Sequence, residues 1–343
     1  MATLTIEQMS AIAALLEQSG KKLIYIAGAS ASGKSYFAKL LQEDLEKKGK
    51  KVLSISSDDY YGNLSSIKYL LYGTFDHPNL IDYDLLQKNI DEYLTTGKTT
   101  LPKYSFVERR RIASEVVNGS ADFIIVEWLY TIAELNDVNA PFKIFVDSHM
   151  EEMIFRRIIR DQQRVKEPVD MIVTMLGKVF PMRRLYGEPQ KAKADLVVEN
   201  NYEILQSIAQ THEYTLLPDA KRSDFGELIK REYITDYMYN DSHEWNGCIL
   251  ISEVYREKRG FLDAVMITKR KADDLDHNAF HTASVRMSHP WLITQLHTLM
   301  QIAGMQYLGI EQKIVSVYEK DSKQVTIKEA RGKMFEEKEI EKK

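Results

Sequence analysis

The chain has 343 residues, of which 44% are hydrophobic and 28% charged, a composition typical of a soluble globular protein long enough for two domains. Its net charge of −4 argues against a general electrostatic attraction to nucleic acid or to an anionic membrane. The single cysteine, Cys248, excludes an intrachain disulfide, and no apolar run approaches the roughly 18 residues of a membrane span. We therefore expect a cytoplasmic protein without nucleic-acid or membrane partners.

Elements of an α/β fold follow in chain order up to about residue 205. A capping box, Thr5-x-x-Gln8, opens an amphipathic helix at 5–18 that is too polar for a signal peptide. Strand-like apolar runs then alternate with longer helical stretches, which predicts a parallel sheet flanked by helices. The predicted strands are 22–27, 52–56, 123–126, 142–146 and 196–198.

The pattern changes beyond residue 205, and we expect a second, smaller α+β domain over 206–343. Shorter β-rich runs occupy 247–255, 261–269, 284–286, 313–320 and 324–327, and a helical stretch at 291–303 interrupts them. Residues 328–343 are dense in Glu and Lys, and we expect them to form a solvated or frayed tail.

The strongest signal in the sequence is the run GASASGKS at 28–35, a full match to the phosphate-binding loop G-x-x-x-x-G-K-[ST]. A predicted strand precedes it and a helical stretch at 36–45 follows, the context in which such a loop cradles a polyphosphate. In that arrangement Lys34 reaches the β- and γ-phosphates, and the Ser35 hydroxyl coordinates Mg²⁺. The residues predicted to bind the nucleotide are Gly28, Ser30, Ser32, Gly33, Lys34 and Ser35. The alternative is a Gly-rich turn that contains Lys-Ser by chance.

Carboxylates follow two of the predicted strands. Asp58 and Asp59 come after the strand at 52–56, and Glu127 ends the strand at 123–126. The carboxyl edge of an open α/β sheet is where ligands bind. A carboxylate there can accept a proton from a hydroxyl that attacks the γ-phosphate, or hold Mg²⁺. The alternative for Asp58 and Asp59 is that they only cap a following helix.

Arg156, Arg160 and Arg164 are spaced by four and form one helical stripe, with Arg157 beside it. One interpretation is a charged surface face in which Glu152 pairs with Arg156. The other is a cationic lid over the phosphoryl group in transfer.

Together these motifs resemble the uridine kinase/phosphoribulokinase family over nearly all of the first 200 residues. The matching runs are GASASGKS at 28–35, SDDYY at 57–61, FDHP at 75–78, PKYSF at 102–106, VE at 126–127, RRIIRD at 156–161 and AD at 194–195. The resemblance implies ATP- and Mg²⁺-dependent phosphorylation of a hydroxyl on a small molecule such as a nucleoside.

Carried over by position, the resemblance makes Asp58 the general base, with Lys34 acting on the phosphates and Glu127 helping Ser35 to hold Mg²⁺. Asp59 stands where the family has Ser or another small polar residue. Arg160 and Arg164 would be catalytic lid arginines, and Asp195 would lie near the adenine end of the nucleotide. The residues implied for the acceptor pocket are Tyr61, Asp76, Tyr104, Phe106, Arg109 and Arg157.

The chain departs from the family pattern at two positions. Arg109 replaces a base-recognising His, and a guanidinium only donates hydrogen bonds whereas a neutral His can also accept one. We therefore expect uridine and cytidine to be poor acceptors, and the preferred substrate to carry an acceptor-rich or anionic group near a buried Arg109. In the alternative, Arg109 turns to solvent and other residues read the pyrimidine. The second departure is Trp128, which puts bulk where the family has Gly.

The region beyond residue 205 resembles the CYTH (triphosphate tunnel) domain, but the hallmark Glu-x-Glu-x-Lys is missing where such a domain should open. We expect any tunnel chemistry to be degenerate, and the domain to be regulatory, dimerising or substrate-gating in a kinase that can form a homo-oligomer. One alternative is a triphosphatase or pyrophosphatase in which this domain is the catalyst. Another is a non-catalytic nucleotide-binding protein, which intact Lys34, Ser35 and Asp58 argue against.

Overall fold

The computed structural model describes residues 2–62, 74–162, 174–201, 210–240, 247–256, 262–271, 279–287 and 292–340. Its contacts divide the chain into two compact units. The first consists of Met1–Ser148 and Lys178–Asn201, and the second of His149–Gly177 and Tyr202–Lys343. The division differs from the single boundary near residue 205, because the segment His149–Gly177 groups with the C-terminal residues.

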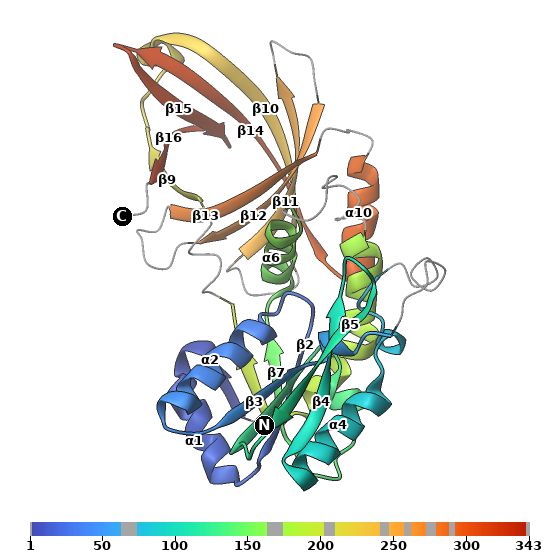
Figure 1. Ribbon diagram of the computed structural model, residues 1–343. Coiled ribbons are helices and arrows are strands. Elements are labelled where there is room, and N and C mark those ends of the chain that lie inside the picture. Colours follow the sequence, from blue (N-terminus) through green and yellow to red (C-terminus); the bar gives the residue numbers. More distant parts are fainter. Residues whose placement is uncertain are drawn as a thin grey trace. The chain divides into compact units, whose positions relative to one another are not determined.

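The first unit is built on a six-stranded parallel sheet in the order β1-β8-β7-β2-β6-β3 (Figure 1). Its strands are β1 (Ala2–Thr5), β2 (Leu23–Gly28), β3 (Val52–Ser56), β6 (Phe123–Glu127), β7 (Phe142–Asp147) and β8 (Leu196–Glu199). The α/β class and all five strands predicted for this region are confirmed, and β1 is an additional edge strand.

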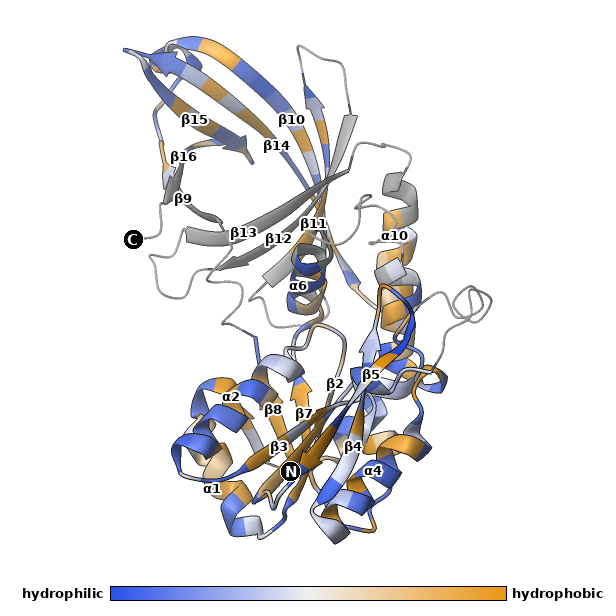
Figure 2. Ribbon diagram, viewed as in Figure 1, coloured by the Kyte–Doolittle hydropathy of each residue, from blue (hydrophilic) through white to orange (hydrophobic). Residues whose placement is uncertain are grey.

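Side chains alternate between the two faces of the sheet along each buried strand, so both faces are apolar. Helices pack on both of them. On β2, Ile24 and Ile26 pack in one apolar cluster with α1 (Met9–Ser19) and α2 (Lys34–Lys47). Tyr25 and Ala27 face the other cluster, which includes α4 (Tyr83–Thr96). Figure 2 shows the strands of the sheet as the most hydrophobic part of the unit. The predicted capping box is confirmed, with the Thr5 N–H donating to Gln8 Oε1 at 2.9 Å.

Shorter helical segments and a hairpin complete the unit. The segments are η1 (Ile6–Gln8), η2 (Ser57–Tyr60), η3 (Pro78–Leu80), α5 (Thr131–Glu134), α8 (Phe180–Met182), η5 (Arg183–Gly187) and η6 (Glu188–Lys193). The hairpin pairs β4 (Lys98–Ser105) with β5 (Arg110–Asn118). Arg111 anchors it by donating at 3.0 Å to both the Tyr60 carbonyl and Asp82 Oδ2.

The second unit contains a closed antiparallel barrel in the order β10-β11-β12-β13-β9-β16-β15-β14. The strands are β9 (Gln210–Leu216), β10 (Glu227–Asn240), β11 (Gly247–Arg256), β12 (Leu262–Lys271), β13 (Ala279–Met287), β14 (Gln306–Lys320), β15 (Lys323–Ala330) and β16 (Lys333–Ile340). The helical segments are α6 (Met150–Gln162), η4 (Met175–Val179), which runs across the division into the first unit, η7 (Arg222–Phe225) and α10 (Leu292–Ala303).

The prediction of a solvated tail at 328–343 is wrong for its described part. Strand β16 pairs with β15 on one side and with β9 on the other, so it closes the barrel. The Tyr214 hydroxyl of β9 donates to Glu337 Oε1 of β16 at 3.1 Å. Buried polar side chains also lie on other strands of the barrel.

One of these polar groups is a buried cluster on three adjacent strands. Asp236 on β10 is 1% exposed, accepts a hydrogen bond from Ser252 Oγ on β11 at 2.6 Å, and forms an ion pair with Lys313 on β14. Burial lowers the pKa of Lys328 on β15, with the positive charge of Lys313 adding to the effect. A buried carboxylate requires such partners, because an unpaired charge in the interior is strongly destabilising.

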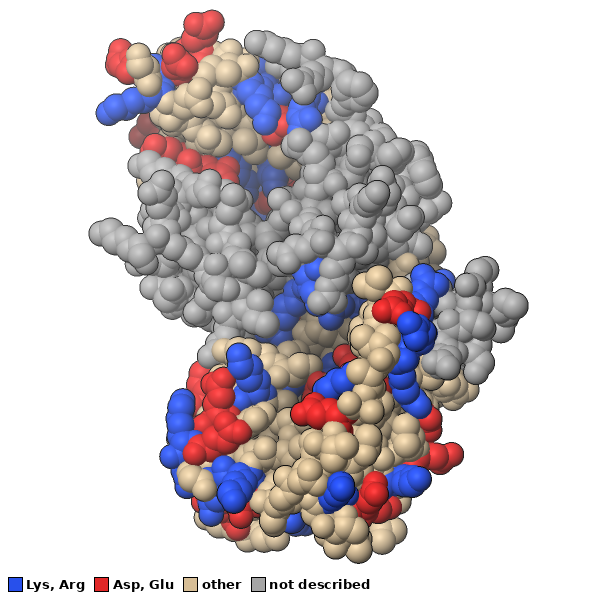
Figure 3. Space-filling view, viewed as in Figure 1, with Lys and Arg blue, Asp and Glu red and all other residues tan. Residues whose placement is uncertain are grey.

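No helix in the described part of the chain is long and apolar enough to cross a membrane. Lysine, arginine, aspartate and glutamate side chains share the visible face of the first unit (Figure 3).

Candidate active site

The phosphate-binding loop lies between β2 and α2, as predicted. Gly28 ends the strand, and a Cβ placed on it would lie 2.5 Å from the Val146 carbonyl oxygen and 2.7 Å from Ser32 Oγ. Gly33 precedes the helix with φ +88°, a left-handed conformation that favours glycine. The two glycines are therefore required by close approach and by backbone conformation, which lets the loop turn tightly into the helix N-terminus.

The loop is supported from behind by residues that follow the neighbouring strands. The Ser32 carbonyl accepts from Asn200 Nδ2 at 2.9 Å and from Ser148 Oγ at 3.2 Å. Ser32 is fully buried, whereas Ser30 is half-buried. Asn200 and Ser148 were missed by sequence reasoning, although each comes directly after the end of an observed strand, β8 or β7, and two residues after the end predicted for it.

Ser35 and Glu127 meet across the carboxyl edge of the sheet. The Ser35 hydroxyl lies 3.2 Å from Glu127 Oε1 and 3.1 Å from Oε2. The Ser56 hydroxyl, at the end of β3, donates to Glu127 Oε1 at 3.2 Å. The donors gathered here are all oxygens, the ligand type that Mg²⁺ prefers. The two residues predicted to hold the metal are thus brought together.

Asp58 lies beside this group, in the short helix η2. Its backbone N–H donates to Ser56 Oγ at 3.4 Å, and its Oδ1 accepts a hydrogen bond from the indole Nε1 of Trp128 at 3.1 Å. Asp58 is exposed as a residue, but desolvation of its carboxyl by the surrounding atoms raises the pKa above its ordinary value of 3.8. The negative charges of Glu127 and Asp76 act in the same direction. The positive charge of Lys34 and the Trp128 hydrogen bond partly offset this rise.

Asp59 has a different environment from its neighbour. Its Oδ2 pairs with Lys103 Nζ at 3.1 Å, and its Oδ1 accepts from the Tyr104 backbone N–H at 3.0 Å. Both partners belong to β4. Asp59 therefore ties η2 to the hairpin, while Asp58 has Glu127 and Lys34 as its electrostatic neighbours.

An aromatic cluster adjoins Asp58 and includes three of the predicted acceptor residues. The Tyr61 ring lies 5.3 Å from the Tyr104 ring, 5.4 Å from Phe106 and 5.7 Å from Phe75, centre to centre. The Tyr61 hydroxyl donates to the Phe75 carbonyl at 2.6 Å. The Tyr104 hydroxyl is buried with no hydrogen-bond partner in the described part of the chain. A buried hydroxyl in that state is suited to meet a polar group of a ligand.

Asp76 is close to the same cluster. It is 7% exposed, and its negative charge helps to raise the pKa values of Tyr61 and Tyr130, which burial raises most. The Tyr130 hydroxyl donates to the Asp76 carbonyl oxygen at 2.8 Å, which fixes the backbone of this residue.

Arg109 is exposed in the turn of the hairpin, with φ +54°. Its positive charge acts on Tyr104, whose pKa is raised by burial and lowered in part by Arg109. The expectation of substrate selection by a buried guanidinium loses its basis here, because the left-handed turn holds the arginine at the surface. The arrangement corresponds to the alternative in which Arg109 turns to solvent.

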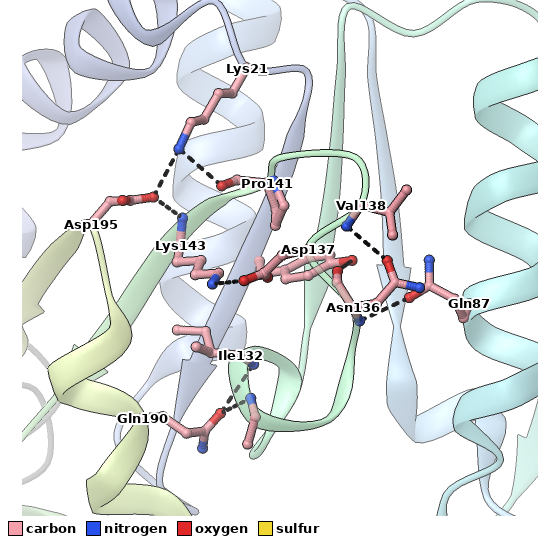
Figure 4. A network of polar contacts seen from close by, with 12 residues as sticks. Lys21, Gln87, Ile132, Asn136, Asp137, Val138, Pro141, Lys143, Gln190 and Asp195 are labelled. Atoms are coloured by element: carbon pink, nitrogen blue, oxygen red, sulfur yellow. Dashed lines mark hydrogen bonds and ion pairs between the residues drawn. The ribbon is translucent and has the colours of Figure 1, made fainter.

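Asp195 does not lie where the resemblance implied. It precedes β8, and its Oδ2 accepts from Lys21 Nζ at 3.2 Å and from the Lys143 N–H at 2.9 Å (Figure 4). Lys21 precedes β2, and Pro141, whose carbonyl also accepts from Lys21, precedes β7. Because these strands are parallel, Asp195 lies at the amino edge of the sheet, opposite the phosphate-binding loop, and its nucleotide role is withdrawn.

The arginines of α6 belong to the second unit. Arg156 and Glu152, both buried, pair at 3.8 Å, which confirms the ion pair of the first interpretation. Arg157 and Arg160 are half-buried on the same helix, and Arg164 lies outside the described residues. The lid and pocket roles of these three residues stay predictions.

The family identified by comparison with known proteins covers the phosphate-binding loop and the carboxylates near it, and extends into His149–Gly177 of the second unit. Residues 23–205 match the model of the Phosphoribulokinase / Uridine kinase family. A uridine kinase of Cronobacter sakazakii is 38% identical over 184 residues, which cover 51% of this chain and 85% of the relative. The uridine kinase of Escherichia coli K12 is 35% identical over 183 residues with the same coverage. A solved structure described as a possible uridine kinase from Bacillus stearothermophilus is 18% identical, with a TM-score of 0.39 over 56% of this chain and 97% of its own, too low to carry a conclusion.

Proposed function

Because the chain belongs to the phosphoribulokinase/uridine kinase family, we propose that its first unit transfers the γ-phosphate of ATP to a hydroxyl of a nucleoside or nucleoside-like molecule. At the coarser level the chain is an ATP-dependent phosphotransferase with a hydroxyl acceptor. The observation that carries the finer proposal is that the carboxylate of Asp58, a solvent-exposed residue, has Lys34, Glu127 and the aromatic residue Tyr61 as electrostatic neighbours.

Asp58 suits the role of general base in this reaction. A base works best when its pKa approaches the operating pH, and desolvation moves the pKa of Asp58 in that direction. The nearby positive charge of Lys34 keeps the carboxylate form accessible and would also face the phosphates. Asp58 would take the proton of the acceptor hydroxyl as that oxygen attacks the γ-phosphorus, and the proton would end on its carboxyl group.

The oxygen donors at the sheet edge fit Mg²⁺. Ser35 and Glu127 lie within hydrogen-bond distance of each other, and Ser56 supports the glutamate. We propose that Ser35 holds the ion directly and that Glu127 orients it or one of its waters. When bound, the ion would neutralise charge on the β- and γ-phosphates.

The aromatic cluster provides the acceptor site in this proposal. Rings of Tyr61, Phe75 and Phe106 form apolar walls at edge-on angles, and Phe106 is 45% exposed, so the cluster is reachable from solvent. The Tyr104 hydroxyl and the Asp76 carboxylate are polar groups suited to the hydroxyls or ring atoms of a sugar or base. Since Arg109 is exposed, uridine and cytidine belong among the expected acceptors.

The test is acceptor-dependent ADP release. Nucleosides, sugars, polyols and vitamin precursors are compared, with hydrolysis of ATP and of inorganic triphosphate measured in the absence of any acceptor. We expect a nucleoside to stimulate ADP release. Lys34→Ala should lower kcat/KM by several orders of magnitude, because it removes the positive charge that stabilises the transferring phosphoryl group. The matched control is Lys39→Ala, an exposed lysine of α2 paired with Glu43, which should retain activity.

Two results would contradict the proposal. One is normal turnover by Lys34→Ala, which would place the chemistry elsewhere. The other is nucleotide or triphosphate hydrolysis that no acceptor accelerates and that survives Lys34→Ala, which would favour the triphosphatase alternative in the second unit. A kcat/KM for uridine of about 10⁴ M⁻¹s⁻¹ or more would show that the pyrimidine is read without a buried Arg109.

A further inference from the structure

Trp128 is a buried residue of the site for which the sequence assigns no chemistry. It follows Glu127 directly, and its backbone N–H donates to the Ile26 carbonyl of β2 at 3.0 Å. The side chain is 2% exposed. The structure therefore places a large indole at the carboxyl edge of the sheet, next to both the metal-side carboxylate and the strand that leads into the phosphate-binding loop.

Three tyrosine rings hold the indole in one orientation. Their centres lie 5.0 Å (Tyr130), 5.9 Å (Tyr83) and 6.3 Å (Tyr61) from that of Trp128, all close to edge-on. Aromatic pairs favour this geometry, and a side chain enclosed by several of them has little freedom to change rotamer. The direction of the indole N–H is accordingly fixed by packing.

That N–H points at the carboxylate proposed as the base. Trp128 Nε1 lies 3.1 Å from Asp58 Oδ1, and no other hydrogen bond to this carboxylate occurs within the described ranges. An indole nitrogen can only donate, so the bond requires a lone pair of the oxygen and is strongest when the carboxylate is ionised. It leaves the second oxygen, Oδ2, to accept a proton.

We propose that Trp128 is a positioning residue for phosphoryl transfer: its indole N–H holds Oδ1 of Asp58, presents Oδ2 to the acceptor hydroxyl, and favours the ionised carboxylate. This inference rests on the proposed function, in which Asp58 is the base. It accounts for a bulky residue where the resembling family has Gly. A smaller side chain there would leave the Asp58 carboxylate without this donor.

The electrostatics of Asp58 agree with that role. Desolvation pushes the carboxyl toward its protonated form, which cannot act as a base, and the Trp128 bond opposes that shift. Lys34 acts in the same direction as Trp128, but its charge is shared with the phosphates once ATP is bound. The indole donor is the contribution that stays with the carboxylate throughout turnover.

The first experiment is the pH dependence of kcat/KM in Trp128→Phe. Phenylalanine keeps an aromatic ring but has no donor, so the acid limb of the profile should move upward by about one pH unit, the size expected for losing a hydrogen bond to a charged group. The matched control is Tyr83→Phe, which removes a buried hydroxyl that has no hydrogen-bond partner among the described residues and should leave the acid limb in place. In an Asp58→Asn background, Trp128→Phe should have no further effect on the profile.

The second experiment needs no activity, so it separates this inference from the proposed function. In a Trp245→Phe, Trp291→Phe variant, Trp128 is the only tryptophan left, and its emission should titrate with Asp58. The titration should disappear in Asp58→Asn. If no acceptor is ever phosphorylated but the emission titrates, the function fails and the Trp128–Asp58 coupling stands. An emission that ignores Asp58, or an acid limb that Trp128→Phe leaves unmoved, would overturn the proposal.

Discussion

The neighbouring carboxylates Asp58 and Asp59 give the sharpest test of the site, because the same Asp→Asn change should lower activity at the first position and only stability at the second. Asn keeps the size and one oxygen of the side chain but cannot accept a proton as a base. Asp58→Asn should therefore lower kcat by about 10² to 10⁴, which corresponds to about 2.7 to 5.5 kcal/mol of activation free energy. Nucleotide affinity should change little, because the phosphate-binding loop is untouched.

For Asp59 the structure predicts a small loss of stability instead. Its partner Lys103 has a side chain that is 46% exposed, and the Asp59 side chain is 25% exposed, so the ion pair is worth about 0.2 to 1 kcal/mol. The amide oxygen of Asn can still accept from the Tyr104 N–H. Asp59→Asn should thus lower the free energy of unfolding by about 1 kcal/mol or less, with kcat within about fivefold of the parent, a change near 1 kcal/mol in activation free energy.

The assay is steady-state ADP release by both variants, together with urea unfolding of each. Unfolding shows whether a loss of activity comes from the fold. Equal losses of kcat in the two variants, or a larger loss in Asp59→Asn, would refute the assignment of Asp58 as base.

Two further expectations follow from the same site. Gly28→Ala should abolish measurable binding of an ATP analogue in calorimetry, because its Cβ would meet the Val146 carbonyl at 2.5 Å. The control Gly187→Ala, with φ −81° and only ordinary contacts, should bind normally. Equal binding by both variants would show that the loop tolerates the clash. The raised pKa of Asp58 means that the folded state binds more protons than the unfolded state above the ordinary value of 3.8. Wild-type stability should therefore fall relative to Asp58→Asn as pH rises from the unfolded-state pKa of Asp58 to its folded-state pKa. The variant should be more stable than the wild type at neutral pH, and the two should be alike well below pH 3.8. Urea unfolding across pH checks this, and a variant that is less stable at neutral pH would contradict the sign.

The sequence by itself determined the first unit to a large extent. Its strands are short apolar runs with clear ends, and the residue that follows each strand end in a parallel sheet must lie at one edge. The positions of Ser35, Asp58 and Glu127 near one another follow from that rule and from the phosphate-binding motif. Local pattern suffices here because each inference concerns a residue and the element adjacent to it.

Tertiary structure decided what depends on side-chain direction or on distant pairing. Neighbours in sequence such as Asp58 and Asp59 separate only once β4 supplies Lys103 and the Tyr104 N–H to one of them. Asp195 matched a family motif, yet it lies at the amino edge because it precedes its strand rather than following it. The hydrophobic pattern of a sequence does not predict the role of a motif residue at one end of a strand. It also does not predict which donor the side chain of that residue will accept from.

The second unit shows the same limit on a larger scale. Strand β16 read as a charged tail, because Glu and Lys dominate it and nothing local reveals a partner. Its partners are β15, next to it in the chain, and β9, more than a hundred residues away, and only the closed barrel brings β9 alongside. Hydrogen bonding along both edges and bonds such as Tyr214 to Glu337 then order a segment whose composition alone favours solvent. Composition fixed the local preference of this segment, and the closure of the barrel overrode it.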